Sequence, residues 1–133
     1  MRILFGDTFY FLGLLNVRDQ HSKRIVDFSA SFRGRLVTTD LILLEVADAL
    51  CSSAERDTLR DYFLHLRSLA SCEVIEASRE LFDRALSLYH RHSDKDWSLT
   101  DCTSFVVMRD RGITEALTGD KHFEQAGFVP LFK

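Results

Sequence analysis

Proline and glycine are scarce in this sequence, with one proline and six glycines among 133 residues. No linker stands out, no segment has low complexity, and we find no internal repeat. Hydrophobic residues make up 46% of the chain and charged residues 28%, a balance typical of soluble globular proteins. This length and composition predict a single domain over residues 1–133.

Paired cysteines and long apolar runs are also lacking. The three cysteines, Cys51, Cys72 and Cys102, are odd in number and form no CxxC motif, which indicates reduced thiols in a cytoplasmic protein. Asp7 interrupts the apolar N-terminus and no small-residue cleavage site follows, so we predict no signal peptide. No apolar run approaches about 18 residues, and we therefore predict no membrane span.

An excess of basic charge is the third absence. The chain carries 17 Lys and Arg against 20 Asp and Glu, a net charge of −3. This balance argues against a protein that coats DNA, because such proteins are usually clearly basic. It leaves a nuclease open, since a bound metal ion would neutralise acids gathered into one site.

Short apolar runs alternate with amphipathic stretches along the chain. The predicted strands cover residues 2–6, 36–38, 73–76, 115–118 and 128–131. The predicted helices cover residues 8–16, 18–32, 41–51, 55–69, 79–92, the segment from Ser98 to Gly112, and 121–125. Alternating strands and helices predict an α/β fold, a three-layer α/β/α sandwich with a mostly parallel central sheet.

Two of the predicted helices carry informative patterns. Helix 41–51 is apolar except for Glu45 and Asp48, which predicts a helix buried nearly all round. Helix 79–92 begins after Ser78, a suitable cap, and has apolar residues at helical spacing. The residues predicted to face the core are Leu81, Phe82, Ala85, Leu88 and Tyr89.

Four acids are candidates for a functional site. Asp7 and Asp120 each follow a predicted strand, at the edge of a parallel sheet where ligands bind. Glu45 lies within an apolar helix, where a carboxylate needs a partner or a metal. Asp101 lies in the first turn of a helix whose neighbouring residues are apolar. Four carboxylates without evident cationic partners predict a Mg²⁺ site.

The expected roles within this site differ. Asp7 and Asp101 are expected to be direct ligands, while Glu45 and Asp120 act through water or hold a second ion. Thr118 is expected to hydrogen-bond one of the ligands. The ion would activate a water toward a scissile phosphorus and stabilise charge on the phosphate oxygens.

Each acid also has a local interpretation. Asp7 could cap the following helix, and Asp101 follows Ser98 at the spacing of a capping box. Asp120, after Gly119, could be a turn residue or a cap. Glu45 could share a solvated stripe with an acid one turn later, although no cap explains it. The acids predict a site only as an ordered set.

Other polar residues have two interpretations each. Asp96 is either an accessory acid or part of a solvated loop. His90 and His92 form an HxH pair without a third ligand at a suitable spacing, which favours exposed side chains. His122 could approach a substrate phosphate, or lie at the surface or cap a helix. Trp97 is interpreted as a core or interface anchor rather than a base-stacking platform.

Basic residues that could contact phosphates are scattered along the chain: Lys23, Arg24, Arg33, Arg35, Arg109, Arg111 and Lys121. Such a scatter is typical of a solvated surface. Arg33 and Arg35 precede a strand, and so belong at the amino end of the sheet, away from the acids.

The whole chain resembles PIN domains, in particular the VapC-type toxins. The resemblance rests on four stretches: ILFGDTFYFLGLL around Asp7, TTDLILLEVADAL around Glu45, DWSLTDCTSFVVMRDRGI around Asp101 and EALTGDKHFEQAGF around Asp120. Gly6 departs from the family, which often has a bulkier apolar residue there, and Asp40 stands where glutamate is common. Neither departure removes one of the four acids.

The resemblance implies a three-layer fold, a magnesium- or manganese-dependent endoribonuclease and frequent homodimers. Toxins of this branch are held inactive by a cognate antitoxin that covers or enters the acidic pocket. The leading hypothesis is therefore the RNA-cleaving toxin of a type II toxin–antitoxin pair. One alternative is a catalytically inert PIN-fold module that binds RNA or protein. A flap-nuclease-like DNA-cutting enzyme is a third, for which the chain lacks the extra helical regions.

Overall fold

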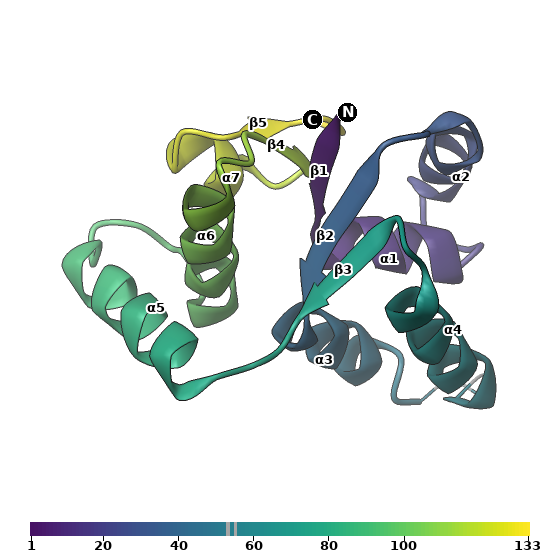
Figure 1. Ribbon diagram of the computed structural model, residues 1–133, viewed down its shortest axis with the longest axis horizontal. Helices are drawn as coiled ribbons and strands as arrows, with labels where there is room; N and C mark the ends of the chain where they lie inside the picture. Colours follow the sequence, from purple (N-terminus) through teal and green to yellow (C-terminus); the bar gives the residue numbers. More distant parts are fainter. Residues whose placement is uncertain (53, 55) are drawn as a thin grey trace.

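Five strands, all parallel, form the central sheet of the computed structural model, which describes residues 1–52, 54 and 56–133 (Figure 1). The strands are β1 (Ile3–Gly6), β2 (Arg35–Thr39), β3 (Cys72–Ile75), β4 (Glu115–Leu117) and β5 (Val129–Pro130). Their order across the sheet is β3-β2-β1-β4-β5, so β1 lies in the middle, between β2 and β4. The predicted parallel sheet is confirmed.

Helices cover the sheet on both sides. They are α1 (Thr8–Leu15), α2 (Ser22–Ser31), α3 (Asp40–Ala49), α4 (Arg56–Ser68), α5 (Arg79–Arg91), α6 (Leu99–Arg111) and α7 (Lys121–Gln125). In Figure 1, α1, α2 and α4 lie on one side and α5, α6 and α7 on the other, while α3 follows the end of β2. The predicted α/β/α sandwich is thus confirmed.

Local sequence signals explain where several helices begin and end. The side chains of Thr39, Ser78 and Ser98 accept hydrogen bonds from the first turns of α3, α5 and α6. Gly112 adopts a left-handed conformation, φ 64°, and ends α6 as predicted. The predicted helix 18–32 begins only at residue 22, because Asp19 forms a turn by accepting a hydrogen bond from the amide of His21. The predicted helix start at residue 55 lies outside the described residues.

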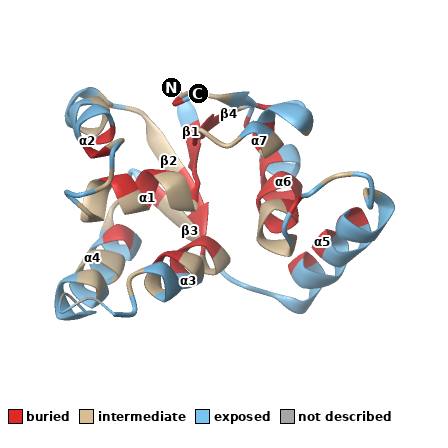
Figure 2. Cartoon of the chain, turned by 180° about the vertical axis from the view of Figure 1, so that it is seen from behind, coloured by how far each residue is buried: buried red, intermediate tan, exposed pale blue. Residues whose placement is uncertain are grey.

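Two predictions about which residues of α3 and α5 are buried are wrong (Figure 2). On α5, Phe82 and Tyr89 are 39% and 47% exposed rather than buried. The residues that pack inward, at positions 81, 85 and 88, already form a complete helical stripe, and Phe82 and Tyr89 lie one position beyond it. On α3, Leu44 is 58% exposed, so that helix is not buried all round.

An aromatic cluster joins the sheet to α6 and α7. The ring of Phe105 on α6 lies 5.0 Å from that of Phe123 on α7, and Phe123 lies 6.5 Å from Phe5 on β1. Trp97 is buried against Phe105, and its indole nitrogen donates a hydrogen bond to Gln125 at 3.1 Å. Trp97 is therefore a core anchor, as predicted, and it fixes the segment that leads into α6.

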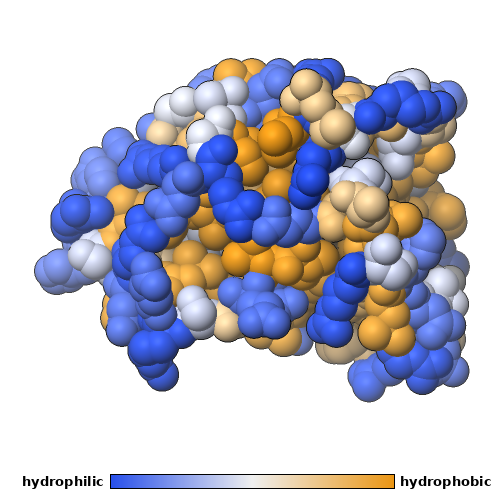
Figure 3. Space-filling model, viewed as in Figure 1, coloured by the Kyte–Doolittle hydropathy of each residue, from blue (hydrophilic) through white to orange (hydrophobic). Residues whose placement is uncertain are grey.

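The surface is mostly hydrophilic, with a band of apolar side chains across the middle of the face in Figure 3. Cys51, Cys72 and Cys102 are free thiols, as the cysteine count predicted. Over the part of the chain that the structure describes, no helix is both long and apolar enough to cross a membrane.

Candidate metal centre

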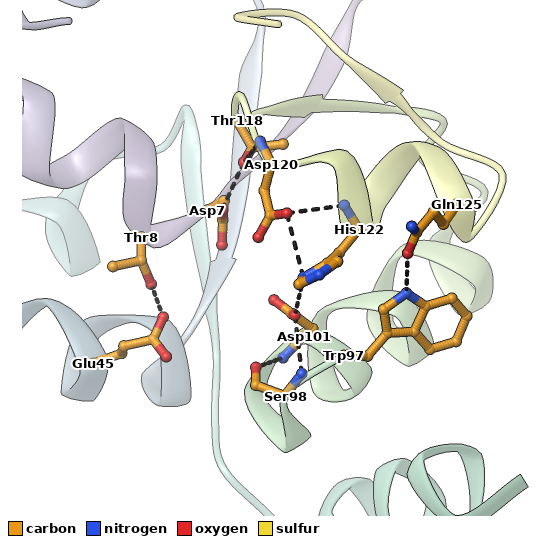
Figure 4. Close-up of polar contacts among 10 residues, drawn as sticks. All are labelled: Asp7, Thr8, Glu45, Trp97, Ser98, Asp101, Thr118, Asp120, His122 and Gln125. Carbon is orange, nitrogen blue, oxygen red and sulfur yellow. Dashed lines mark hydrogen bonds and ion pairs between the residues drawn. The ribbon is translucent and has the colours of Figure 1, made fainter. Parts of the chain in front are cut away.

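All four predicted acids line one pocket of about 350 Å³ at the carboxyl edge of the sheet. Figure 4 shows Glu45 on one side, Asp101 and Asp120 on the other, and Asp7 between them. Asp7 follows β1, Glu45 projects from α3, Asp101 belongs to the first turn of α6, and Asp120 precedes α7. The fold thus brings together side chains from four separate segments, and the strand-end argument predicted this position for Asp7 and Asp120.

Asp7 is the most deeply buried of these acids, with 6% of its surface exposed. Although it precedes α1, its side chain makes no capping hydrogen bond, so the local interpretation of Asp7 as a cap is wrong. Its Oδ2 instead accepts a hydrogen bond from Thr118 Oγ1 at 2.7 Å. Burial raises the pKa of Asp7 to about 7, and the charges of Asp101 and Glu45 add to this effect, while the Thr118 hydrogen bond opposes it.

Thr118 connects two acids through one buried hydroxyl. Its Oγ1 donates to Asp7 and accepts a hydrogen bond from the amide of Asp120 at 3.1 Å. The carbonyl of Thr118 in turn accepts a hydrogen bond from the amide of Phe132 at 2.9 Å. Arg24 donates to the carbonyl of Phe132 at 3.1 Å. The end of the chain therefore supports the residue that orients Asp7.

We expect Thr118→Val to weaken metal binding about 10–100-fold, the usual effect of losing a hydrogen bond that orients a ligand. Valine keeps the branched shape of threonine but leaves Asp7 and the Asp120 amide without their shared hydroxyl. Calorimetric titration with Mn²⁺ measures the effect. Thr103→Val is the matched control, because the buried hydroxyl of Thr103 donates a hydrogen bond within α6, to the carbonyl of Thr100, and does not contact an acid of the pocket among the described residues. Equal Mn²⁺ affinities for both variants would contradict the assignment.

Asp101, Asp120 and His122 form the tightest group in the pocket. Their ligand atoms lie within 4.8 Å of one another. His122 Nδ1 lies 3.1 Å from Asp101 Oδ2 and 3.3 Å from Asp120 Oδ1. Asp7 and Glu45 line the same pocket outside this group. Burial raises the pKa of Asp101 and the charge of Asp120 adds to it, while the Ser98 amide and His122 lower it.

The local interpretations of Asp101 and Asp120 hold alongside their place in the pocket. Asp101 and Ser98 form a complete capping box, with the Ser98 amide 3.1 Å from Asp101 Oδ2. Asp120 Oδ1 accepts a hydrogen bond from the amide of His122 at 2.9 Å at the start of α7. A cap at a helix that begins at the sheet edge points its carboxylate into the pocket, so the two interpretations do not exclude each other.

His122 has a place in the pocket that the sequence did not predict. The sequence leaves open a phosphate contact, a surface position or a cap, whereas the side chain lies between two carboxylates and is 19% exposed (Figure 4). The available signal was its position two residues after Asp120, within the same helical start. His90 and His92, by contrast, do not belong to the metal-binding group found among the described residues.

Glu45 and Asp96 complete the acidic lining. The hydroxyl of Thr8 donates a hydrogen bond to Glu45 Oε1, and Glu45 is half-buried. Asp48 is exposed and lies outside the pocket lining, so the two acids do not act as one solvated stripe. Asp96 is an exposed residue of the loop before α6, yet it also lines the pocket.

The donor set fits a hard divalent cation. Neither lysine nor arginine is among the described residues that line the pocket, whereas five carboxylates are. The buried Asp7 has a neutral hydroxyl as its hydrogen-bond donor, which leaves its charge uncompensated. Oxygen-rich sites of this charge suit Mg²⁺ or Mn²⁺. Asp101, Asp120 and His122 are close enough together to share one ion, and Asp7 and Glu45 offer further carboxylates in the same pocket.

The basic residues considered in the sequence are not among the described residues that line the pocket. Arg35 and Arg111 both pair with Glu73 on β3, at 3.8 and 2.6 Å. Lys23 pairs with Asp27 on the exposed face of α2 at 3.0 Å. Their main contacts are therefore structural, which agrees with the interpretation of these charges as a solvated surface.

Comparison with known proteins agrees with this geometry. The sequence profile described as the PIN domain matches residues 4–129. The chain is 29% identical over 130 residues to proteins named 23S rRNA-specific endonuclease VapC20, from Mycobacterium tuberculosis strains H37Rv and CDC 1551. That alignment covers 97% of this chain and 98% of each relative.

Comparison with solved structures also finds proteins similar to this chain. The crystal structure of M. tuberculosis VapC20, described as a sarcin–ricin loop cleaving toxin, superposes with a TM-score of 0.86 and 28% identity. It covers 97% of this chain and 98% of its own. The structure of FitAcB from Neisseria gonorrhoeae gives a TM-score of 0.64 at 14% identity over 98% and 96% of the two chains, which supports the fold alone. With its profile match, fold and acidic pocket together, the chain belongs to the PIN domain family.

Proposed function

We propose that this PIN domain is a divalent-metal-dependent endoribonuclease that hydrolyses RNA phosphodiester bonds, with Mg²⁺ as its ion and Mn²⁺ as a substitute. The observation that carries the proposal is the convergence of Asp7, Glu45, Asp101 and Asp120 on one pocket that lacks a lysine or arginine among its described lining residues. The full-length similarity to an endonuclease supports the same activity. A nuclease of this type needs a metal ion to neutralise the negative charge of its own carboxylates and that of the RNA phosphate.

The residues of the pocket would have different roles, some in holding the ion and others in positioning its ligands. Asp101 and Asp7 would hold the ion directly, with Asp120 and Glu45 acting through water or holding a second ion. Thr118 holds Asp7 in place, and the Thr8 hydroxyl holds Glu45. A bound ion would supply Lewis-acid stabilisation of the phosphate and lower the pKa of an attacking water. His122 fixes the relative positions of Asp101 and Asp120 through its contacts with both.

The substrate is proposed to be ribosomal RNA with an accessible loop. The VapC20 relative is named for 23S rRNA and its structure for the sarcin–ricin loop, and both matches span nearly the whole chain. Proteins that read RNA sequence mostly do so in loops, whose bases can be splayed out. An open pocket at the sheet edge is compatible with such a substrate.

The direct test is cleavage of purified 23S rRNA and of total RNA with Mg²⁺ or with EDTA. We expect defined cleavage products with Mg²⁺ and none with EDTA, because the acids repel the phosphate without an ion. Asp48→Asn should cleave like the wild type, since Asp48 is an exposed acid outside the pocket. If the wild type gave no more product with Mg²⁺ than with EDTA, the endonuclease proposal would be wrong.

An antitoxin, a homodimer and a cytoplasmic location are further parts of the proposal. The acidic pocket is open and would accept a cationic side chain from a cognate antitoxin. Exposed leucines on α3 and α4, Leu44 and Leu64, offer apolar surface for a second copy. Reduced cysteines and an RNA substrate suit the cytoplasm. Co-purification with the product of a neighbouring small gene tests the antitoxin. Light scattering tests the homodimer.

The inert-module alternative makes a different prediction. A pocket that binds metal should raise the thermal stability of the protein when Mg²⁺ or Mn²⁺ is added, because the ion binds the folded state. An inert module would show no such shift. The retention of all four acids in one pocket favours the active enzyme.

A further inference from the structure

A second pocket, of about 730 Å³, adjoins the acidic pocket. The C-terminal half of α5 and the loop before α6 form it, and its lining includes Leu86, Tyr89, His90, His92, Lys95 and Trp97. Asp96 lines both this pocket and the acidic one. The two pockets are therefore neighbours, and we call the second one the Tyr89 pocket.

The Tyr89 pocket is lined by exposed apolar side chains and by the buried, hydrogen-bonded Trp97. Tyr89 is 47% exposed and Leu86 is 44% exposed, although their helix is otherwise packed against α6. Trp97 is buried and tied to Gln125, and the ring of His92 lies 4.8 Å from the Trp97 ring. The amide of Lys95 donates to the carbonyl of His92 at 3.0 Å and closes the loop. An exposed aromatic ring on a rigid support is a suitable stacking surface.

Polar groups in the same pocket can read a base and attract a phosphate. His90, His92 and Lys95 offer hydrogen-bond donors, and the carboxylate of Asp96 offers an acceptor. Lys95 also lies 3.2 Å from Asp94, an exposed neighbour, so its charge is partly compensated at the surface. This mixture of one aromatic face with both donors and acceptors matches the edge of a nucleobase better than an apolar protein surface.

We propose that the Tyr89 pocket is a nucleobase-binding subsite, which receives an unpaired base next to the phosphate held at the acidic centre. The inference rests on the proposed function and names the part of the RNA that this region recognises. The volume lies within the usual range of small-molecule sites, about 300–1,000 Å³. Stacking on Tyr89 would supply affinity, while His92, Lys95 and Asp96 would discriminate between bases.

The competing occupant is a second protein chain on the exposed face of α5. That face continues to Phe82, which is 39% exposed two turns before Tyr89 and does not line the pocket. Continuity with the acidic pocket through Asp96 favours RNA instead. Phe82 therefore provides a matched control, because a protein interface would include both aromatic residues and a base subsite only Tyr89.

The experiment measures binding of fluorescein-labelled RNA octamers of A, C, G or U, and of an abasic octamer, with Ca²⁺ in place of Mg²⁺. Fluorescence anisotropy gives the Kd, and a gel confirms that the RNA stays intact. We expect Tyr89→Ala to weaken binding of at least one base-bearing octamer about tenfold, with Tyr89→Phe close to wild type. The abasic octamer should bind the wild type and Tyr89→Ala equally, since it has no base to stack.

Several results would overturn the proposal. These are unchanged binding by Tyr89→Ala, an equal loss for the abasic octamer, or no measurable binding of any octamer by the wild type. An altered oligomeric state in both Phe82→Ala and Tyr89→Ala, seen by light scattering, would instead identify a protein interface. If RNA binding depended on Tyr89 but the wild type cleaved no RNA, only the endonuclease proposal would be wrong. If Tyr89→Ala cleaved RNA at the wild-type rate and with the wild-type preference among bases, only the subsite proposal would be wrong.

Discussion

Changing Asp101 to asparagine is expected to lower the rate of RNA cleavage by more than about 100-fold. Lost hydrogen bonds to ligands alone account for about 10–100-fold in metal sites, and Asp101 belongs to the tightest ligand group itself. Asparagine has nearly the size of aspartate and retains an oxygen that can accept the hydrogen bond from the Ser98 amide. The variant therefore removes a charge next to Asp120 and His122 while it preserves the start of α6. Single-turnover cleavage with Mg²⁺ measures the loss.

Stability measurements separate this effect from the capping role of Asp101. Loss of a cap costs about 0.5–2 kcal/mol, which lowers the melting temperature but leaves a folded protein. A variant that is folded and still more than 100-fold slower has lost chemistry rather than structure. Asp48→Asn on the exposed side of α3 is the matched control and should cleave normally. If Asp101→Asn cleaved as fast as this control, Asp101 would not be a ligand.

The metal-free protein should become more stable when Asp7 is changed to asparagine. The pKa of Asp7 rises from 3.8 to about 7 because the folded protein buries the carboxyl group. Between these values the folded state holds a proton that the unfolded state releases, so the free energy of unfolding falls as the pH rises. The loss is about 1.4 kcal/mol per pH unit and levels off above about pH 7. At pH 8, the free energy of unfolding of Asp7→Asn should therefore exceed that of the metal-free wild type by on the order of 4 kcal/mol.

Urea denaturation in EDTA at several values between pH 5 and pH 8 measures this effect. The wild type should lose stability across the window more steeply than Asp7→Asn, whose side chain does not titrate. Asp48→Asn should keep the slope of the wild type, because its carboxyl group is exposed. Saturating Mn²⁺ should remove most of the advantage of Asp7→Asn, since the ion neutralises the carboxylate in the wild type. Identical pH slopes for the wild type and Asp7→Asn would show that Asp7 is not a buried, uncompensated acid.

The sequence predicted the sheet, its helical layers and the four acids because each depended on short-range patterns. A strand followed at once by Asp7, or by Gly119 and Asp120, places the acid at the sheet edge whatever the details of the packing. The role of Asp7 within the site required long-range information. Its partner Thr118 lies 111 residues away, and this contact rather than a helix cap fixes the carboxylate.

Tyr89 and His122 show where local patterns stop being informative. Helical periodicity assigned Tyr89 to the core, but it could not indicate that three other residues already fill the contact with α6. The spacing of His122 from Asp120 indicates one of its two neighbours, but its contact with Asp101 depends on α7 beginning beside the first turn of α6, which is a tertiary arrangement. Residues at the rim of a site are the hardest to assign, because both solvent and a ligand suit them.

The hydrogen bond from Phe132 to the carbonyl of Thr118 has a consequence for cleaved forms of the protein. A chain cut before Phe132 would carry all four acids but lack the contact that supports the residue orienting Asp7. Proteolysis at this position would therefore weaken the metal pocket without removing any of its carboxylates.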